Sequence, residues 1–333
     1  MTDEELPLDP TAHLFYEAVH NLGWNTNAEA LSKRVKRLAL GLPAEDELSV
    51  ILSWLGETRL VHKLDQHQTP PDSKSHYRVP DLLVVFEHEG RRVATLVEVK
   101  STTKKVVRWS ADYVESLRRC AEELGLPLLV AVRWRILGWW TLFELRHFKR
   151  ARTGYRITFE EALIETLLGS LAGDFSAGLR AGVGLHFKMR KEEKLAEAVE
   201  GNVRHETWQL RIDDAYFADA DGRRQQRRGP GIWPFFLAAQ SDADSKSDET
   251  HICQSFVVPP EQPMVWAHQA LIVLLGFQTA EERSLRWRQI LQQHALPIDI
   301  TTLRESAVAG LSERIVQRVV DMRPHTMPEF MKA

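Results

Sequence analysis

The spacing of hydrophobic residues predicts alternating helices and strands over the first part of the chain. Between residues 43 and 56, leucine and isoleucine recur at the 3.6-residue period of an amphipathic helix, with a proline suited to its first turn and a glycine suited to its end. Shorter runs that alternate or are wholly apolar predict strands. The expected order is helix 43–56, strand 58–64, strands 81–88 and 91–100, helix 111–125, and strands 127–134 and 138–145.

This order predicts an α/β (α+β) fold in which a mixed sheet is flanked by helices. Strands 81–88 and 91–100 are joined at Glu89-Gly90, which indicates a hairpin. Strand 127–134 is apolar without alternation, a pattern typical of a strand that is buried on both faces.

The pattern changes near residue 155 and predicts a second α+β domain of unassigned fold. A length of 333 residues also favours two domains over one. The predicted division is an N-terminal helical extension at 1–42, a core at 43–150 and a C-terminal domain at 155–333. Within the last of these, the pattern predicts helix at 158–172, strand at 177–189, strand and turn at 206–224, a polar loop at 241–250 and three helices within 263–321.

Composition narrows the class of protein. The formal net charge is -3 and neither half is basic as a whole, so binding of a polyanion would depend on local clusters of Lys and Arg. Only Cys120 and Cys253 are present, which excludes a disulfide framework and a CxxC metal site. The N-terminus lacks the apolar stretch of a secretory signal, and no apolar run reaches about 18 residues. We therefore expect a cytoplasmic protein without a membrane segment.

Charged residues end the strand 91–100, where the sequence reads LVEVK. Because side chains alternate along a strand, Glu98 and Lys100 share one face. The hairpin places the start of the preceding strand beside them, so we expect Asp81 to approach Glu98. Two converging carboxylates, with the Val99 carbonyl as a further oxygen ligand, suit Mg²⁺, with Mn²⁺ as a substitute. Lys100 would orient or activate a water, or neutralise developing charge, in phosphodiester hydrolysis.

Pro80-Asp81 and Glu98-Val99-Lys100 together resemble the motif of the PD-(D/E)XK nuclease superfamily. The layout of residues 43–148 is similar to the archaeal Holliday-junction-resolvase branch, which has a restriction-endonuclease-like core. The resemblance implies a metal-dependent nuclease in which Asp81 and Glu98 bind the metal and Lys100 assists the attacking water.

The same resemblance implies a further acid on the first helix, for which Glu45 is the candidate and Glu47 the second choice. Many relatives carry a glutamine on the helix that follows the motif, near the place where this chain has Tyr113. DNA is expected as the substrate ahead of RNA, and a role in defence, restriction or a mobile element is expected by association. The C-terminal domain would then supply targeting, a protein partner or a homodimer contact.

Clusters of basic residues are candidates for contacts with nucleic-acid phosphates. Some follow the motif directly or lie on helix 111–125, and others lie in a loop at 222–229 that packs four arginines. Each cluster is also what an ordinary solvated surface would carry. The candidates are Lys104, Lys105, Arg108, Arg118, Arg119, Arg223, Arg224, Arg227 and Arg228.

Three other interpretations stay open. Asp81 could cap a turn while Glu98 and Lys100 form a solvated strand end, although the apolar run that leads into the charged pair then has no explanation. The chain could keep a nuclease fold and bind nucleic acid or assemble with a partner without cutting. It could also be a Holliday junction resolvase, which would require a dimer and which the long second half disfavours.

Overall fold

The computed structural model describes residues 44–65, 68, 70, 72–200, 203–225, 232–239, 242–261, 264–281, 284–285 and 300–332. Contacts divide the chain into two compact units, the first formed by 1–174, 274–300 and 321–333 and the second by 175–273 and 301–320. Both units mix helices and sheets, which confirms the predicted fold class. The division into domains at 43–150 and 155–333 stays a prediction, and the extension 1–42 lies outside the described residues.

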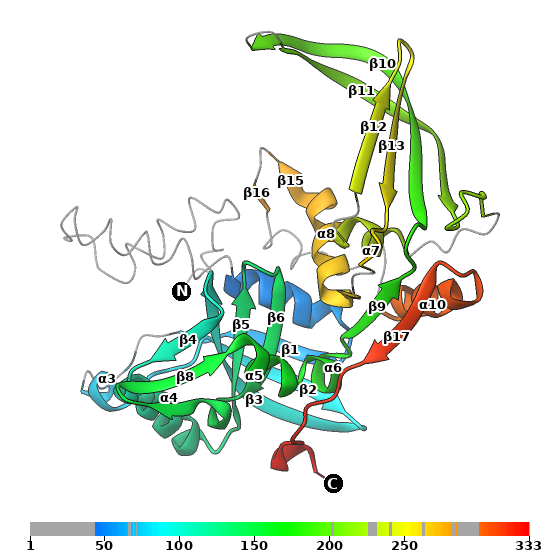
Figure 1. Ribbon diagram of the computed structural model, residues 1–333. Coiled ribbons are helices and arrows are strands. Elements are labelled where there is room, and N and C mark those ends of the chain that lie inside the picture. The colour runs from blue at the N-terminus through cyan, green and yellow to red at the C-terminus, as the bar shows by residue number, and fades with distance from the viewer. Residues whose placement is uncertain are drawn as a thin grey trace. The chain divides into compact units, whose positions relative to one another are not determined.

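The central sheet of the first unit has the strand order β1-β2-β3-β5-β6 (Figure 1). β3 is antiparallel to β2 and parallel to β5, while the remaining neighbours are antiparallel, so the sheet is mixed as predicted. Residues 44–54 form the helix that precedes it. The strands are β1 (Thr58–Lys63), β2 (Leu82–His88), β3 (Arg91–Thr102), β5 (Leu128–Trp134) and β6 (Trp139–Glu144).

β2 and β3 form the predicted hairpin. Glu89 and Gly90 have φ values of 49° and 77°, as expected for a two-residue turn in which both central residues have positive φ. The register pairs Leu82 with Val97, so the next positions in line are Asp81 and Glu98. The turn therefore sets which charged residues lie opposite each other at the far end of the hairpin.

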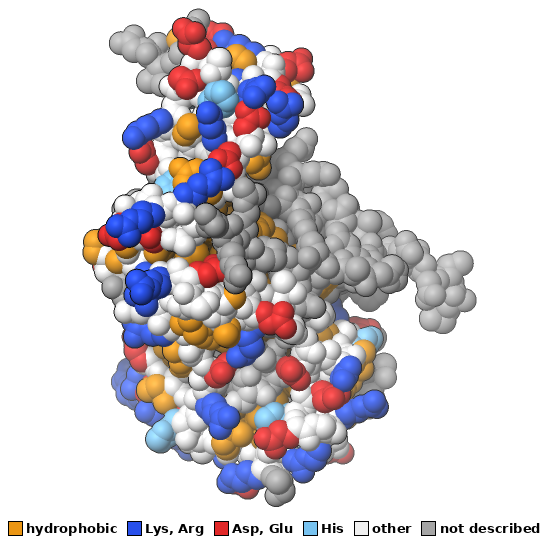
Figure 2. Space-filling view, turned by 90° about the vertical axis from the view of Figure 1, so that its right-hand side faces the viewer, with side chains coloured by type: hydrophobic (Ala, Val, Ile, Leu, Met, Phe, Trp, Pro, Cys, Tyr) orange, Lys and Arg blue, Asp and Glu red, His pale blue; other side chains and the backbone are white. Residues whose placement is uncertain are grey.

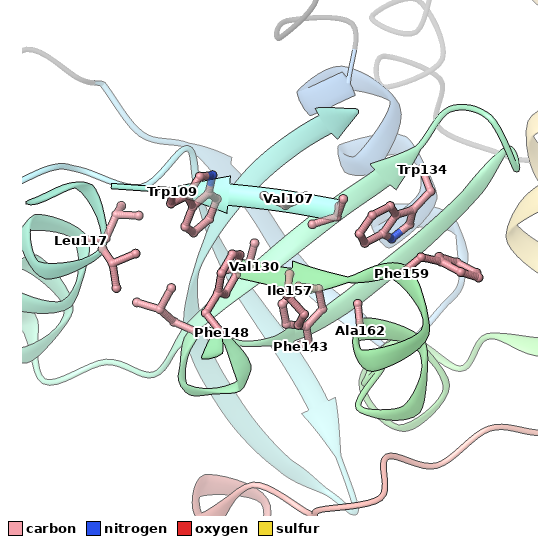
Figure 3. Packing of buried hydrophobic residues seen from close by; sticks show 13 residues of the cluster. Val107, Trp109, Leu117, Val130, Trp134, Phe143, Phe148, Ile157, Phe159 and Ala162 are labelled. Atoms are coloured by element: carbon pink, nitrogen blue, oxygen red, sulfur yellow. The ribbon is translucent and has the colours of Figure 1, made fainter. Parts of the chain in front are cut away.

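Helix α4 (Ala111–Leu124) supplies the crossover that the parallel pair β3 and β5 requires. The Ser110 hydroxyl caps it by accepting a hydrogen bond from the Tyr113 N–H, and Gly125 ends it in the left-handed conformation. The apolar face of α4 packs into a cluster of buried residues (Figure 3). Its members are Val107, Trp109, Val114, Leu117, Val130, Val132, Trp134, Phe143, Leu145, Phe148, Ile157, Phe159 and Ala162.

A small sheet of order β4-β8-β7 covers this cluster. Its strands are β4 (Val106–Trp109), β7 (Lys149–Ala151) and β8 (Gly154–Thr158). β4 was not among the predicted strands, because four residues are too few to show a period and its pairing with β8 is what makes it a strand. Through Val107, Trp109 and Ile157 the small sheet contributes buried side chains to the cluster.

Residues 158–172, predicted as one helix, instead form α5 (Phe159–Ile164) and α6 (Leu168–Ala172). The helix is interrupted because residues 166 and 167 form hydrogen bonds with β6. The Thr166 hydroxyl accepts a hydrogen bond from the Leu142 N–H at 3.1 Å, and the Leu167 N–H donates to the Leu142 carbonyl at 2.6 Å. These bonds to a strand replace the bonds that would continue the helix.

The second unit holds a three-stranded sheet, β14-β9-β17, and a four-stranded sheet, β11-β10-β13-β12. Beyond Arg190, β10 pairs only with β11 among the described strands, and the two continue as a ribbon. The strands are β9 (Phe175–Leu179), β10 (Gly184–Glu200), β11 (Val203–Ala218), β12 (Asp242–Ser247), β13 (His251–Val257), β14 (Met264–Trp266) and β17 (Val316–Asp321).

The remaining elements are short helices and one small strand pair. The helices are α3 (Ser73–His76), α7 (Trp233–Ala238), α8 (Ala267–Thr279) and α10 (Ile300–Ser312) with the 3₁₀ turns η1 (Leu145–His147) and η2 (Glu329–Met331), and the pair is β15 (Ala280–Glu281) with β16 (Ser284–Leu285). None of the helices in the described part of the chain has both the length and the hydropathy to cross a bilayer.

Three sequence predictions for the second unit are wrong. Residues 177–189, predicted as one strand, form the end of β9 and the start of β10 with a turn at 181–182 between them. Residues 241–250, predicted as a polar loop, contain β12, which forms because β13 offers it a hydrogen-bonding edge even though its side chains are polar. Residues 316–321, predicted as helix, form β17 beside β9. α8 and α10 agree with two of the three helices expected within 263–321, and residues 286–299 lie outside the described part.

Gly154 tests the close packing of the small sheet. Its φ is 132°, and a Cβ atom there would lie 2.2 Å from the Trp109 carbonyl oxygen. Gly154→Ala should therefore lower the free energy of unfolding by more than about 2 kcal/mol, measured by urea denaturation. Gly90→Ala is the control, because its φ is also positive but no atom lies within 4 Å of the added Cβ, so the expected loss is about 1 kcal/mol. Equal losses in the two variants would contradict the packing argument.

Candidate functional site

Asp81 and Glu98 lie side by side where β2 begins. The hairpin register that pairs Leu82 with Val97 brings them together. The Asp81 carboxylate accepts a hydrogen bond from the Val99 N–H, with the nitrogen 2.7 Å from Oδ2. Asp81 is only 6% exposed and Glu98 only 3%, so two carboxyl groups are buried at one strand junction. A solvated strand end would expose them.

Lys100 and Tyr113 both contact Glu98. The Lys100 Nζ lies 3.6 Å from Glu98 Oε1 and donates to the Tyr113 hydroxyl at 3.0 Å. The Tyr113 hydroxyl in turn donates to the same Glu98 oxygen. Carboxylate, ammonium and phenol therefore form a closed network, which joins β3 to the first turns of α4.

The environment of Asp81 favours its protonated form. Burial raises the pKa of the Asp81 carboxyl well above its ordinary value of 3.8, and the charges of Glu98 and Glu45 raise it further. The hydrogen bond from the Val99 N–H and the charge of Lys100 act in the opposite direction but are weaker. A positive charge beside the two carboxyl groups would favour their ionised forms.

Burial also raises the pKa of the Glu98 carboxyl above its ordinary value of 4.5. Lys100, the Tyr113 hydroxyl and the charge of Arg78 oppose that shift. The pKa of the Tyr113 hydroxyl is raised by burial and by the adjacent Glu98 charge, so the phenol keeps its proton and acts as a donor.

The oxygen atoms at this junction are the ones that could hold a small divalent cation. A residue in an extended strand directs its N–H and its carbonyl to the same side, so the Val99 carbonyl faces the side on which Asp81 lies. No cluster of three or more His, Cys, Asp or Glu side chains converges among the described residues. Two carboxylates and one carbonyl are the set expected for Mg²⁺, which prefers oxygen ligands and keeps several waters. The positive charge would offset the repulsion between Asp81 and Glu98.

The two predicted acids of the first helix occupy different environments. The Glu45 Oε2 lies 3.0 Å from the Lys63 Nζ, and its charge acts on both Asp81 and Glu98, so it faces the site. Its support of a metal ion stays a prediction.

Glu47, the second choice for the acid, is 1% exposed, and its carboxylate contacts residues of the sheet. Its carboxylate accepts a hydrogen bond from the Trp140 indole at 2.9 Å and pairs with Arg133 at 2.7 Å. These two contacts connect the first helix to β5 and β6. Glu47 therefore has a structural role at that place.

Sequence reasoning missed three neighbours of the site. Tyr113 was noted only as a departure from the expected glutamine, yet its hydroxyl contacts both Glu98 and Lys100. The Arg78 guanidinium lies 4.3 Å from the centroid of the Tyr113 ring. Lys63 pairs with Glu45. The signal that could have found Tyr113 is its place in the first turn of the crossover helix, at the end of the strand that carries the motif.

Among the basic candidates, Lys104, Lys105 and Arg108 are exposed and follow the site directly, in the turn after β3 and on β4. Arg118 pairs with Glu115 at 2.7 Å, and the Arg119 side chain donates to the Glu115 carbonyl at 3.3 Å. The first three are therefore better placed to meet a polyanion.

In the second unit, Arg223 and Arg224 are both exposed; Arg223 lies 3.7 Å from Asp221, and Arg224 pairs with Asp214 at 2.7 Å. Arg227 and Arg228 lie outside the described residues. Figure 2 shows Lys and Arg side chains interspersed with Asp and Glu over the face of the molecule that it displays. The roles predicted for these basic residues stay predictions.

Comparison with known proteins adds little to this geometry. No family model matches the chain, and no curated protein matches it. Among solved structures, a Holliday junction resolvase of the archaeal hyperthermophile Archaeoglobus fulgidus is similar, with 21% sequence identity and a TM-score of 0.31 over 38% of this chain and 94% of that chain. A TM-score this low carries no argument about function.

The buried carboxylates predict an unusual dependence of stability on pH. Since the pKa of Asp81 is raised in the folded state, that state keeps a proton which the unfolded chain releases above its ordinary pKa of 3.8. The free energy of unfolding should fall as pH rises from about that value through the folded pKa. In EDTA at neutral pH, Asp81→Asn should raise the free energy of unfolding by on the order of 1 kcal/mol, because it removes a buried group whose ionisation the folded state disfavours.

The measurement is urea denaturation between pH 4 and pH 8, and the gain of Asp81→Asn should shrink toward the acidic end. Asp72→Asn is the matched control, since Asp72 is exposed, follows a proline as Asp81 does, and makes no side-chain capping bond. A loss of stability in Asp81→Asn at neutral pH would contradict the raised pKa.

Proposed function

We propose that the protein is a Mg²⁺-dependent nuclease of PD-(D/E)XK type and that it acts as a DNA endonuclease. The observation that carries this proposal is the convergence of Asp81, Glu98 and Lys100 at one strand junction, with both carboxyl groups buried. A turn cap or a solvated strand end would not require buried acids beside a lysine. The similarity of residues 43–148 to the resolvase layout gives the superfamily, with its restriction-endonuclease-like core, as the proposed affiliation.

Each residue would have a definite task. Asp81, Glu98 and the Val99 carbonyl would hold the metal, and Glu45 would support it from the first helix. When bound, Mg²⁺ stabilises negative charge on the phosphoryl oxygens and lowers the pKa of a bound water; Mn²⁺ is a possible substitute. Lys100, held by Tyr113, would orient the attacking water and neutralise developing charge.

Partner binding is proposed for the second unit. Four of its exposed large apolar side chains lie on the paired strands β10 and β11, namely Leu195, Val199, Leu210 and Ile212. Exposed apolar residues gathered on one element are typical of a protein interaction surface. They support a protein partner or a homodimer contact through this unit.

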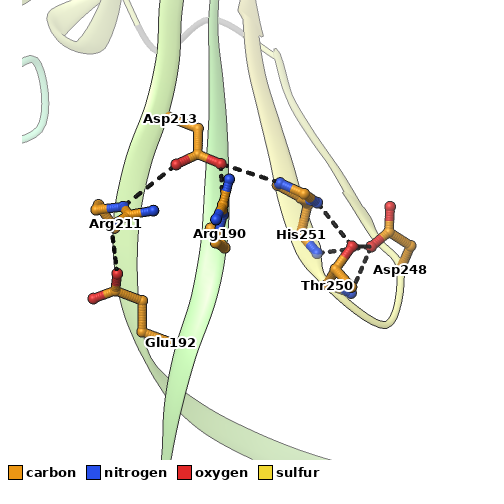
Figure 4. Close-up of polar contacts among 7 residues, drawn as sticks. All are labelled: Arg190, Glu192, Arg211, Asp213, Asp248, Thr250 and His251. Carbon is orange, nitrogen blue, oxygen red and sulfur yellow. Dashed lines mark hydrogen bonds and ion pairs between the residues drawn. The ribbon is translucent and has the colours of Figure 1, made fainter.

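Acids on the same sheet pair with two of its arginines, Arg190 and Arg211. Asp213 pairs with Arg190 at 2.8 Å and lies 3.4 Å from the Arg211 Nε, and His251 also contacts it (Figure 4). Such a surface suits a protein better than a polyanion. A role in defence, restriction or a mobile element, and a cytoplasmic location, stay part of the proposal.

Cleavage of supercoiled plasmid and of labelled single strands of DNA and RNA tests the reaction, with Mg²⁺, Mn²⁺ or EDTA. Wild type should cut in either metal and not in EDTA. Asp81→Asn, Glu98→Gln and Lys100→Met should each lower the rate by at least about 100-fold, because each removes charge stabilisation or a metal ligand.

Lys246→Met is the control for Lys100→Met, since the Lys246 side chain is 82% exposed on the second unit. Its rate should match wild type. Metal-dependent cutting that survives all three site substitutions would rule out this site as the catalytic centre. Binding of nucleic acid by wild type without any cutting would favour the alternative of a non-cleaving binding subunit, and preferential cutting of four-way junctions would favour a resolvase.

A further inference from the structure

Arg78 is held in a fixed position beside the site. It lies on the segment between α3 and β2, three residues before Asp81, and is exposed. Its backbone N–H donates to the Ser116 carbonyl on α4 at 3.1 Å, and its guanidinium lies 4.3 Å from the centroid of the Tyr113 ring. The residue is therefore anchored to α4 through its backbone and again through its side chain.

The N–H groups of this guanidinium have no hydrogen-bond acceptor among the described residues. Within the described part of the chain, the Arg78 side chain makes no ion pair and no hydrogen bond; its guanidinium contacts the Tyr113 ring, and its charge acts on Glu98. By contrast, Arg118 and Arg133 each pair with a glutamate. Stacking on an aromatic face leaves the edges of a planar guanidinium open, and these edges match the geometry of a phosphate.

The ring on which Arg78 stacks belongs to the closed network of the site. The Tyr113 hydroxyl contacts both Glu98 and Lys100, so the stacked cation lies one side chain away from the proposed catalytic groups. A phosphate bound at the free edge of Arg78 would therefore lie close to the residue pair that acts on the scissile bond.

We propose that Arg78, stacked on Tyr113, binds a phosphate of the nucleic-acid strand and positions that strand at the site. This inference rests on the proposed function, because it assigns the substrate contact of the same site. Tyr113 then has two separate tasks: its ring supports the binding residue, and its hydroxyl holds Glu98 and Lys100. The competing interpretation is that Arg78 merely covers the Tyr113 ring and contributes packing.

Binding in EDTA separates these interpretations, because it does not depend on cleavage. Fluorescence anisotropy with labelled duplex and single-stranded DNA would be measured over a range of salt concentrations. Arg78→Gln should weaken binding about 10-fold and reduce the slope of log K against log salt by about 1, as expected for the loss of one phosphate contact. Arg78→Lys should keep the slope and recover only part of the affinity, since lysine retains the charge but not the planar fork.

Arg92→Gln is the matched control. Arg92 is an exposed arginine on β3, six residues before Glu98 and thus roughly 20 Å from it along the strand. Its substitution should change affinity by less than about 2-fold. The unfolding midpoint of Arg78→Gln, measured in the same buffer, should equal that of wild type.

Two changes at Tyr113 test the stacking itself. Tyr113→Phe keeps the ring and should weaken binding less than Tyr113→Leu, which removes the platform and should weaken binding as Arg78→Gln does. The double variant Arg78→Gln/Tyr113→Leu should lose no more than either single variant, because the two residues act as one unit.

Wild-type affinity and salt slope in Arg78→Gln, or a lowered unfolding midpoint with unchanged binding, would overturn the inference and leave the nuclease proposal intact. Absence of nucleic-acid binding by wild type would overturn it as well. Binding that depends on Arg78 in a protein that never cleaves would support the inference and refute the nuclease proposal. Cleavage kinetics give the same distinction, since loss of a substrate contact should raise KM more than it lowers kcat.

Discussion

Burial of two carboxyl groups at one strand junction is the constraint on which the rest of the site depends. Asp81 and Glu98 lose hydration and repel each other, and both effects disfavour their ionised forms. The surrounding polar groups offset part of that cost through the Val99 N–H, the Lys100 ammonium and the Tyr113 hydroxyl. A protein has little reason to keep such an arrangement for stability alone, which is why it supports a functional interpretation.

The position of α4 determines whether those compensating groups reach the carboxylates. Its first turn carries Tyr113, and the Ser110 cap fixes where that turn begins. The centroid of the Trp109 ring, just before the cap, lies 4.5 Å from the centroid of the Phe148 ring and 5.0 Å from that of the Tyr113 ring. The close approach of Gly154 to the Trp109 backbone thus links the packing of the small sheet to the geometry of the site.

The parts of the site that were predictable from sequence follow from the length of the hairpin turn and from the alternation of side chains along a strand. A two-residue turn at Glu89-Gly90 makes Asp81 and Glu98 opposite neighbours, and alternation places Glu98 and Lys100 on one face. The roles of Tyr113 and Arg78 were not predictable in this way, because they depend on how a helix and an irregular segment approach the sheet in three dimensions. The polar strand β12 was missed for a related reason: it exists through pairing with β13 and not through any period of its own.

Charge placement bears on how such a site would select its substrate. The net charge of -3 gives no general attraction for a polyanion, and beyond about 10 Å salt screens most of what remains. Arginines such as Arg133 and Arg190 are neutralised by acids, whereas Arg78 presents its donors beside the buried carboxylates. Basic side chains confined to the site would bind a nucleic-acid strand only where the phosphates of that strand can reach them. Selection of the substrate would then depend on the geometry of the nucleic-acid strand at the site more than on overall affinity for nucleic acid. Tight or sequence-specific binding would require a partner or the second unit.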